Sequence, residues 1–579
     1  MAEKPVRIAL IKPSRYDDDG YVIQWRRSSI PSNSLASLYA VVVDCAERRV
    51  LGEEVALEVE AYDETNSVLP MNRIRRWVAG GGPGSFVGLV GVQSNQFPRA
   101  MDIGNPLRDA GLAVVVGGFH VSGCISMLPE LPPDIQAAQD RGMVLYAGEC
   151  EGRLEELLRD LRAGAPKPVY DYLKDLPGME DQPVPILPRE NVKRTMGWYT
   201  SFDAGRGCPF QCSFCTIINV QGRKSRFRTA DDIERIVRTN WAQGVRRFFV
   251  TDDNFARNKN WEAIFDRLIK LRQEEKLRVF LILQVDTLCH KIPNFIEKAK
   301  AAGTRRVYIG LENINPENLA GAKKKQNRIW EYREMTQAWK SQGITNYAGY
   351  IMGFANDTPE RIERDIKIIM EELPIDLLQF FPLTPLPGSE DHQRLHKQGV
   401  PMDPDMNKYD LEHVVVDHPK MTRQAWSDTY WRAWDIFYTK AHMERVMRRH
   451  VANGMTTLQI LAPLMWFKGY PVIEKVHPIQ GGFLRRKVRT QRRSGLPLES
   501  RAVFYPRRLA EVTSAVYRWS KLYLELRAIA WKIDRDPAKL TYMDKALSPV
   551  TSEEKEDELE MMETYGDQVA GKRRPRKAA

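Results

Sequence analysis

Three cysteines lie close together in the stretch GRGCPFQCSFC, residues 205–215. Cys208, Cys212 and Cys215 have the spacing C-x3-C-x2-C, and the sequence places no fourth cysteine and no histidine beside them. A structural zinc site normally recruits four protein ligands. Three thiolates on a four-iron cluster would instead leave one iron free to bind another molecule. The spacing therefore favours an iron–sulfur cluster with an open position.

The segment that carries these cysteines alternates apolar strands with helical stretches. Amphipathic patterns such as residues 229–244 separate the strands, and Asp231 and Asp232 favour a helix start there. Right-handed crossovers would roll six such units into an open (β/α)6 barrel of the TIM type, with the cysteine loop at the catalytic end of its first strand. The predicted strands lie near residue 202 and at residues 246–254, 279–287, 305–313, 346–354 and 377–385.

An earlier segment has the same alternation, with five short, β-branched strands. It predicts a doubly wound, Rossmann-like sheet, which binds ligands beyond the carboxyl ends of its strands. The predicted strands are residues 7–14, 55–64, 86–94, 112–120 and 143–149. The residues expected to gather on that rim are Ser94, Asn95, Gln96, Gly117, Gly118 and His120.

Composition divides the 579-residue chain into five parts. Proline crowding predicts a linker at residues 166–195, between the first domain at 1–165 and the barrel at 196–400. Helical patterns predict a mainly helical domain at 401–548, and blocks of acid and base predict a disordered tail at 549–579. Because residues 1–11 lack a signal-peptide pattern and the apolar run 458–467 is too short to cross a bilayer of about 30 Å, we expect a cytoplasmic protein.

The cysteine motif, with Phe214 before its last cysteine, resembles that of the radical S-adenosylmethionine (SAM) superfamily. The resemblance implies a [4Fe-4S] cluster whose open iron binds SAM, and reductive cleavage to a 5′-deoxyadenosyl radical. Acidic residues at the second strand end depart from the family's Gly-Gly-Glu but keep its charge, and Asn356 replaces the glutamate that ends the family's fifth-strand motif. The resemblance implies SAM contacts at Asp252, Asp253, Asn254, Glu312, Asn313, Gly349, Ile351 and Gly353.

The whole chain also resembles the cobalamin-dependent branch of this superfamily, in which a corrinoid-binding sheet precedes the barrel. The stretches VQSNQFPRA, VVGGFHVSG and AGECEG carry this likeness. It implies cobalamin as a third cofactor, bound by the rim of the first sheet. The first domain has no D-x-H-x-x-G motif, so His120 is counted among the rim residues but is not assigned as a cobalt ligand.

These cofactors together imply a cobalamin-dependent methyltransferase that acts on an unactivated carbon of an apolar small molecule, with flavodoxin or ferredoxin as electron donor. A cobalamin-dependent cyclase or rearrangement enzyme without methyl transfer remains an alternative. The basic run at residues 483–495 and the net charge of +11 also leave open an RNA-modifying protein or peripheral membrane contact. A solvated helix face is the simpler interpretation of such a run.

Overall fold

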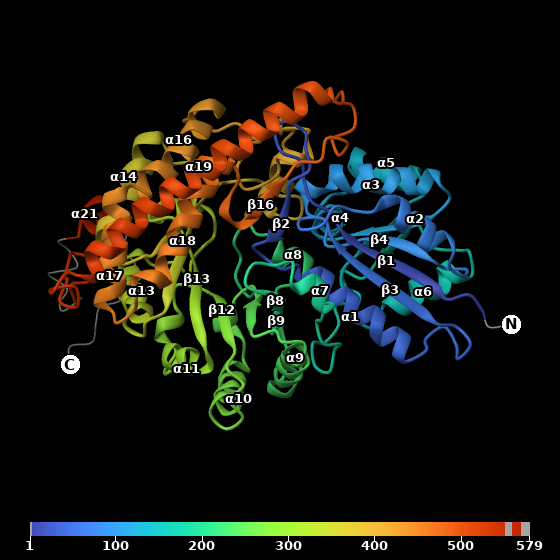
Figure 1. The fold of residues 1–579 in the computed structure, drawn as a ribbon, viewed down its shortest axis with the longest axis horizontal. Coiled ribbons are helices and arrows are strands. Elements are labelled where there is room, and N and C mark those ends of the chain that lie inside the picture. The colour runs from blue at the N-terminus through green and yellow to red at the C-terminus, as the bar shows by residue number, and fades with distance from the viewer. Residues whose placement is uncertain (1–2, 550–558, 569–579) are drawn as a thin grey trace.

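A computed structural model describes residues 3–549 and 559–568 of the chain (Figure 1). The N-terminal domain is a six-stranded parallel sheet in the order β3-β1-β4-β5-β6-β7. The order reverses between β1 and β4, so a ligand crevice is expected at the carboxyl ends of these two strands. The strands are β1 (Val6–Lys12), β3 (Leu57–Asp63), β4 (Phe86–Leu89), β5 (Ala113–Gly117), β6 (Val144–Ala147) and β7 (Val169–Asp171).

Helices cover both faces of this sheet because successive side chains of each strand point to opposite faces. Ile8 and Leu10 pack in one apolar core with α1 and α6, and Ala9 and Ile11 pack in another with α2 and α3. The helices are α1 (Asn33–Glu47), α2 (Met71–Ala79), α3 (Phe97–Asp109), α4 (Phe119–Met127), α5 (Pro133–Asp140) and α6 (Leu154–Arg162).

The second domain is the predicted open barrel, with six parallel strands in the order β15-β14-β13-β12-β11-β8. Its strands are β8 (Tyr199–Phe202), β11 (Arg247–Val250), β12 (Phe280–Val285), β13 (Thr304–Glu312), β14 (Thr345–Met352) and β15 (Leu377–Pro382). Its helices are α9 (Ala230–Ala242), α10 (Trp261–Gln273), α11 (Phe295–Ala302), α12 (Pro316–Gly321), α13 (Tyr332–Ser341), α14 (Pro359–Glu372) and α15 (Glu390–Lys397). The predicted fold class is therefore confirmed.

The C-terminal part packs against the barrel side of the molecule and is mainly helical (Figure 1). Its helices are α16 (Arg423–Phe437), α17 (Lys440–Ala452), α18 (Thr457–Gly469) and α19 (Arg501–Asp534). It also contains one unpredicted strand, β16 (Gly482–Arg486), which pairs antiparallel with β2 (Gln24–Ser28) near the start of the chain. Among the described residues, no helix is both long enough and apolar enough to cross a bilayer.

Two segments differ from the sequence prediction. Strand β7 lies inside the predicted linker at 166–195 and pairs with β6, so part of that linker belongs to the first sheet. The predicted disordered tail contains helix α21 (Glu560–Tyr565), whose Met561, Met562 and Tyr565 are buried. Burial of these apolar side chains stabilises the helix, which the charged composition of the surrounding sequence did not predict. Residues 550–558 and 569–579 of that predicted tail lie outside the described residues.

Candidate functional site

The cysteine loop follows β8 at the carboxyl end of the barrel. A short strand, β9 (Gly205–Arg206), pairs with β10 (Arg226–Phe227), and helix α8 (Ile217–Val220) follows the last cysteine. The amide of Cys208 donates to the Gly222 carbonyl at 3.2 Å, and the amide of Cys215 donates to the Cys212 carbonyl at 3.2 Å. Backbone hydrogen bonds therefore link Cys208 to the end of this loop and Cys215 to Cys212.

The three thiols lie in a buried environment. Burial, with a smaller contribution from the neighbouring Cys212, raises the pKa of Cys208 to about 11 and that of Cys215 to about 12. In the described part of the chain, the only three metal-ligating side chains whose donor atoms all lie within 4.8 Å of one another are Asp410, Glu412 and His413. The cysteines are thus spread more widely than the sulfur atoms around one tetrahedral zinc, about 3.8 Å apart for Zn–S bonds of about 2.3 Å.

A buried ion pair lies beside the cysteine loop. Glu312, at the end of β13, pairs with Lys324, and both side chains are 10% exposed. The Lys324 ammonium also lies 5.7 Å from the centre of the Phe214 ring, and Gln326 donates to the Cys212 sulfur at 3.6 Å. Lys324 and Gln326 were missed by the sequence analysis, because they lie in a loop rather than at a strand end.

The acidic stretch after β11 divides into different roles. Asp252 accepts a hydrogen bond from the Ala204 amide at 2.5 Å, and burial raises its pKa to about 8. Asp253 accepts from the Gly207 amide at 3.0 Å, and burial raises its pKa to about 7. Asn254 instead bonds with Asp286, just beyond the end of β12, at 2.8 Å. Asp253 is therefore the member of the stretch that directly supports the cysteine turn.

The predicted contacts on β13 and β14 surround an apolar cluster beneath the cysteines. Ile351 packs there with Phe354 and Phe214. The Asn313 side chain donates to the Ile351 carbonyl at 3.2 Å and accepts from the Asn315 amide at 2.8 Å. It therefore holds the backbone of β14 to the loop that follows β13.

Two glycines of this fifth-strand motif are required by neighbouring aromatic side chains. A Cβ on Gly349 would lie 2.2 Å from the Tyr308 hydroxyl. A Cβ on Gly353, whose φ is +104°, would lie 1.7 Å from the Trp426 ring. Close packing by protein atoms therefore accounts for both glycines.

The rim predicted for the first sheet is not one continuous surface. His120 is 1% exposed; its Nδ1 lies 3.1 Å from the Ser94 hydroxyl and its Nε2 lies 2.9 Å from Asp134. Both ring nitrogens of His120 therefore have protein partners. Asn95 and Gln96 line a separate cavity of ≈ 200 Å³ beside Ile479 and Gln480.

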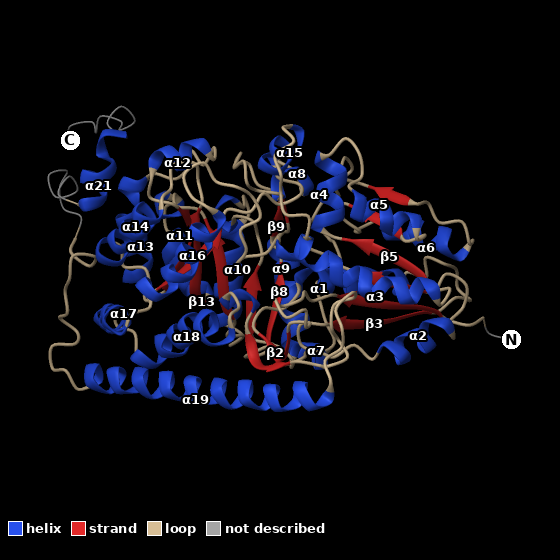
Figure 2. Cartoon of the chain, turned by 90° about the horizontal axis from the view of Figure 1, so that it is seen from above, coloured by secondary structure: helices blue, strands red, loops and turns tan. Residues whose placement is uncertain are grey.

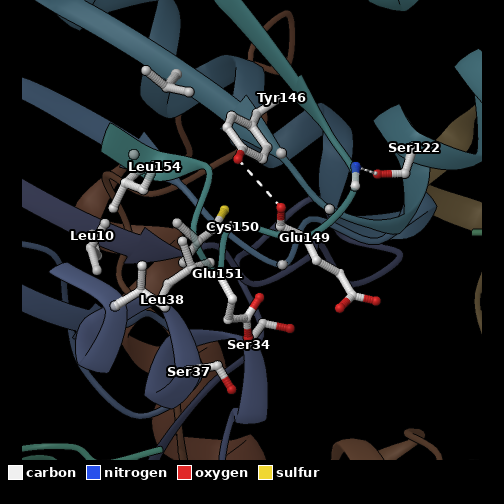
Figure 3. Close-up of a pocket in the computed structure, with 18 of the residues that line it drawn as sticks. Leu10, Ser34, Ser37, Leu38, Ser122, Tyr146, Glu149, Cys150, Glu151 and Leu154 are labelled. Carbon is white, nitrogen blue, oxygen red and sulfur yellow. Dashed lines mark hydrogen bonds between the residues drawn. The ribbon is translucent and has the colours of Figure 1, made fainter. Parts of the chain in front are cut away.

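Gly117 and Gly118 do line a cavity at the carboxyl ends of β1, β4, β5 and β6. The cavity has a volume of ≈ 160 Å³, and apolar side chains such as Leu10, Leu38 and Leu154 surround it (Figure 3). Gly118 is also fixed by the fold, since its φ is +144° and a Cβ there would lie 2.2 Å from the Val92 nitrogen. The strand reversal between β1 and β4 therefore coincides with a real cavity.

Polar groups enter this cavity from one side. Ser34 and Ser37 project from α1 (Figure 3), and Arg206 and Gln221 reach it from the barrel. The Ser37 hydroxyl and the Asn33 side-chain oxygen are buried without a hydrogen-bond partner in the protein. The cavity thus lies between the two domains and offers unsatisfied hydrogen-bonding groups to a ligand.

A second large cavity lies inside the barrel. It has a volume of ≈ 460 Å³ and is lined on one side by Trp466 and Phe467 of α18. Gln284 links this cavity to the acidic stretch after β11, because its side chain lines the cavity and donates to the Asp252 carbonyl at 3.3 Å. Gln379 also lines it and has a buried side-chain oxygen without a partner. The remaining lining side chains include Tyr199, Phe249, Ile282, Arg306, Tyr308, Tyr347 and Leu377.

Arg206 joins the two domains two residues before Cys208. Its guanidinium contacts Asp203 at 2.6 Å and reaches across the domain boundary to Glu149 and Glu151, both at 2.7 Å. Burial raises the pKa of Glu151 and of Asp203, but the charge and hydrogen bonds of Arg206, helped at Asp203 by Arg228 and Asn33, together outweigh it and hold both pKa values below their usual range. All four side chains are buried, so the cation and the carboxylates depend on one another.

Replacing Arg206 with Met should destabilise the protein by about 3–5 kcal/mol, because buried carboxylates lose their cation. Without it, burial would raise the folded-state pKa of Glu151 and Asp203 above the unfolded values of about 4. The variant should therefore lose further stability as pH rises, whereas the native carboxylates lose theirs only below about pH 4.

Thermal unfolding followed by circular dichroism between about pH 5 and pH 8, a range above the usual pKa of about 4 for Asp and Glu, measures this effect. The matched control is Arg423→Met, which removes an ion pair whose side chains are 39% and 71% exposed. Its unfolding midpoint should stay close to that of the native chain. A midpoint for Arg206→Met that does not change with pH would contradict the role of Arg206.

Comparison with known proteins agrees with this architecture. Residues 204–369 match the family model described as the radical SAM superfamily. The chain is 26% identical over 410 residues to a hopanoid C-2 methylase of Rhodopseudomonas palustris, covering 66% of this chain and 72% of that protein. It is 27% identical over 330 residues to a bacteriochlorophyllide d C-12(1)-methyltransferase of Chlorobaculum tepidum, covering 56% of this chain and 68% of that protein.

A solved structure shows the same fold over most of the chain. The radical SAM methyltransferase TsrM of Kitasatospora setae, with cobalamin and a [4Fe-4S] cluster bound, superposes with a TM-score of 0.57 at 15% identity. The match covers 91% of this chain and 100% of that one. The radical SAM domain implies a [4Fe-4S] cluster and SAM as cofactors. The chain therefore contains a radical SAM domain at residues 204–369, and its overall fold is similar to that of a cobalamin-binding radical SAM methyltransferase.

Proposed function

We propose that the protein is a cobalamin-dependent methyltransferase that cleaves SAM reductively at a [4Fe-4S] cluster and methylates an unactivated carbon of a largely apolar small molecule. One observation carries the proposal. The three-cysteine turn lies at the carboxyl end of the barrel, and Arg206 connects this turn to the cavity at the strand ends of the first sheet. Relatives named as methylases and methyltransferases support the reaction type.

Cys208, Cys212 and Cys215 would hold the cluster. The other four cysteines lie elsewhere: Cys45 and Cys124 are buried in helices of the first domain, Cys150 follows β6, and Cys289 bonds with Trp339. A fourth thiol therefore does not reach the turn, and one iron would stay open for SAM. Lys324 supplies positive charge near the thiolates, which a cluster with anionic ligands needs.

Among the predicted SAM contacts, Asp253 and Glu312 fit best. The charge of Asp253 acts on the Cys208 and Cys215 thiols. Glu312 forms an ion pair with Lys324, which lies near the cysteines. Both carboxylates could accept hydrogen bonds from the ammonium or the ribose of SAM. We assign a positioning role, through the backbone, to the remaining polar residues of that set, which are Asp252, Asn254 and Asn313.

The cavity between the domains fits part of a cobalamin. Its volume of ≈ 160 Å³ is too small for the corrin ring, but its apolar walls and unpartnered Ser37 and Asn33 oxygens suit a flat, nitrogen-containing tail. When bound, the cluster supplies an electron for SAM cleavage and cobalamin supplies a transferable methyl group. The protein's own residues orient both groups and exclude water between the domains.

The cavity inside the barrel is our candidate for the substrate site. Its aromatic lining suits an apolar molecule, while Arg306 and the unpartnered oxygen of Gln379 could orient polar substituents. A one-electron donor such as flavodoxin or ferredoxin would reduce the cluster.

Replacing Cys212 with Ala should abolish SAM cleavage and remove most of the bound iron, because two remaining thiolates do not hold the cluster. Iron content, the cluster absorbance and 5′-deoxyadenosine release after anaerobic reconstitution measure this outcome. Cys45→Ala is the matched control, since Cys45 packs in α1 away from the turn. Full cleavage by the Cys212 variant would refute the cluster assignment.

Replacing Ser37 with Leu should fill the cavity between the domains and lower cobalamin retention by roughly tenfold or more, because a tail group no longer enters. The ultraviolet and visible spectrum of protein after gel filtration measures retained corrinoid. Iron content and SAM cleavage should stay at the native level. A variant that retains cobalamin as the native protein does would show that this cavity is not the tail site.

Metabolites extracted from cells with and without the gene should differ by a product that carries label from methyl-labelled methionine. The product should be heavier than its precursor by one methylene, because methyl transfer replaces one hydrogen. Mass spectrometry of apolar extracts measures both properties. An unlabelled product would favour the cyclase or rearrangement alternative, and a mass change confined to RNA would refute the small-molecule substrate.

A further inference from the structure

Helix α19 (Arg501–Asp534) is a 34-residue helix that runs along one edge of the molecule (Figure 2). Only a few of its side chains are buried, namely Phe504, Leu526, Ala530 and Ile533. Helices of soluble domains normally bury one apolar face and expose a polar one. Helix α19 departs from this pattern, because many of its large apolar side chains are exposed.

One face of α19, next to its buried face, carries a stripe of large apolar side chains. The exposed fractions are 58% for Tyr505, 69% for Leu509, 37% for Val512, 54% for Val516 and 45% for Tyr523. Their spacings of four, three, four and seven residues place them on one face of the helix. We call these five residues the apolar stripe. A contiguous exposed apolar surface of this kind marks an interaction site.

Basic side chains accompany the stripe. Helix α19 contains seven Lys and Arg residues against three Asp and Glu. The helix is too highly charged to cross a bilayer, but its excess of basic side chains favours contact with an anionic surface. Strand β16, which borders the first half of α19, adds Phe483 at 51% exposure and Leu484 at 47%. Arg486 lies on the same strand.

The stripe borders a groove that leads into the molecule. The groove has a volume of ≈ 680 Å³ and lies between α19, α18 and β16. Val512 and Val516 of the stripe line it together with Trp519. Met196 and Trp466 line both this groove and the cavity inside the barrel. These two side chains therefore form a wall that the groove shares with the candidate substrate site.

We propose that the apolar stripe of α19, together with Phe483 and Leu484, docks on the surface of an anionic membrane, and that the groove behind it admits an apolar substrate from the lipid. The entry role rests on the proposed function; the docking does not. The charge of α19 favours a membrane over a second copy of the chain as the partner of this surface. Two copies of the basic helix would repel each other, whereas anionic lipids attract it. Apolar side chains then enter the interface between headgroups and acyl chains.

Co-sedimentation of the full-length protein with vesicles tests the docking. The native chain should bind vesicles of phosphatidylcholine with phosphatidylglycerol more tightly than vesicles of phosphatidylcholine alone, and added salt should weaken binding. The affinity of the double variant Leu509→Glu/Val516→Glu for these vesicles should fall by about tenfold or more, because two apolar contacts are lost and two negative charges are added. Val68→Glu, which changes a side chain that is 41% exposed in the first domain, is the matched control and should bind as the native chain does.

Two further measurements separate the alternatives. SAM cleavage in vesicle-free solution should be equal in the native chain and the double variant, so failure of the docking is distinguishable from failure of the proposed function. Light scattering without vesicles should give the same mass for both proteins. Equal vesicle binding by the double variant would overturn the proposal. A native dimer that the double variant converts to monomer would also overturn it and would assign the stripe to self-association.

Discussion

The buried guanidinium of Arg206 is the constraint on which the arrangement of the two domains depends. It lies in the short strand between β8 and the cysteine turn, and its partners Glu149 and Glu151 follow strand β6 of the first sheet. Neither carboxylate would be stable in this buried position without a cation, and the cation would be equally costly without them. Arg226 adds a second cation to Glu149 at 2.5 Å. The ends of two separate sheets are thereby held against each other beside the candidate cluster site.

The strands and the cysteine turn could be predicted from sequence, because each depends on a local pattern. All six barrel strands lie where the apolar runs predict them, and helix α9 begins at the capping box of Thr229 and Asp232. Strand β7 and helix α21 were missed for the opposite reason. Proline and charge dominate their surroundings, while tertiary packing supplies their stability.

The individual polar contacts could not be predicted, because a strand end shows which residues gather there but not which atoms remain free. His120 is a clear case: the sequence places it on a ligand-binding rim, yet Ser94 and Asp134 occupy both of its nitrogens. Asp252 and Asn313 likewise use their side chains to hold backbone groups. Conversely, Lys324 reaches the cysteines from a loop, a contact that depends on the course of the chain through space.

The ribbon formed by β2 and β16 has a consequence for how the chain reaches this state. Trp25 donates to the carbonyl of Gln480, a residue 455 positions away, and is 1% exposed. During synthesis β2 and Trp25 emerge early, but their partners arrive only after both α/β domains have been made. Contacts of such long sequence separation form slowly. The first domain is thus completed only after most of the chain has been translated, and until then its exposed tryptophan and unpaired strand are a point at which nascent chains can aggregate.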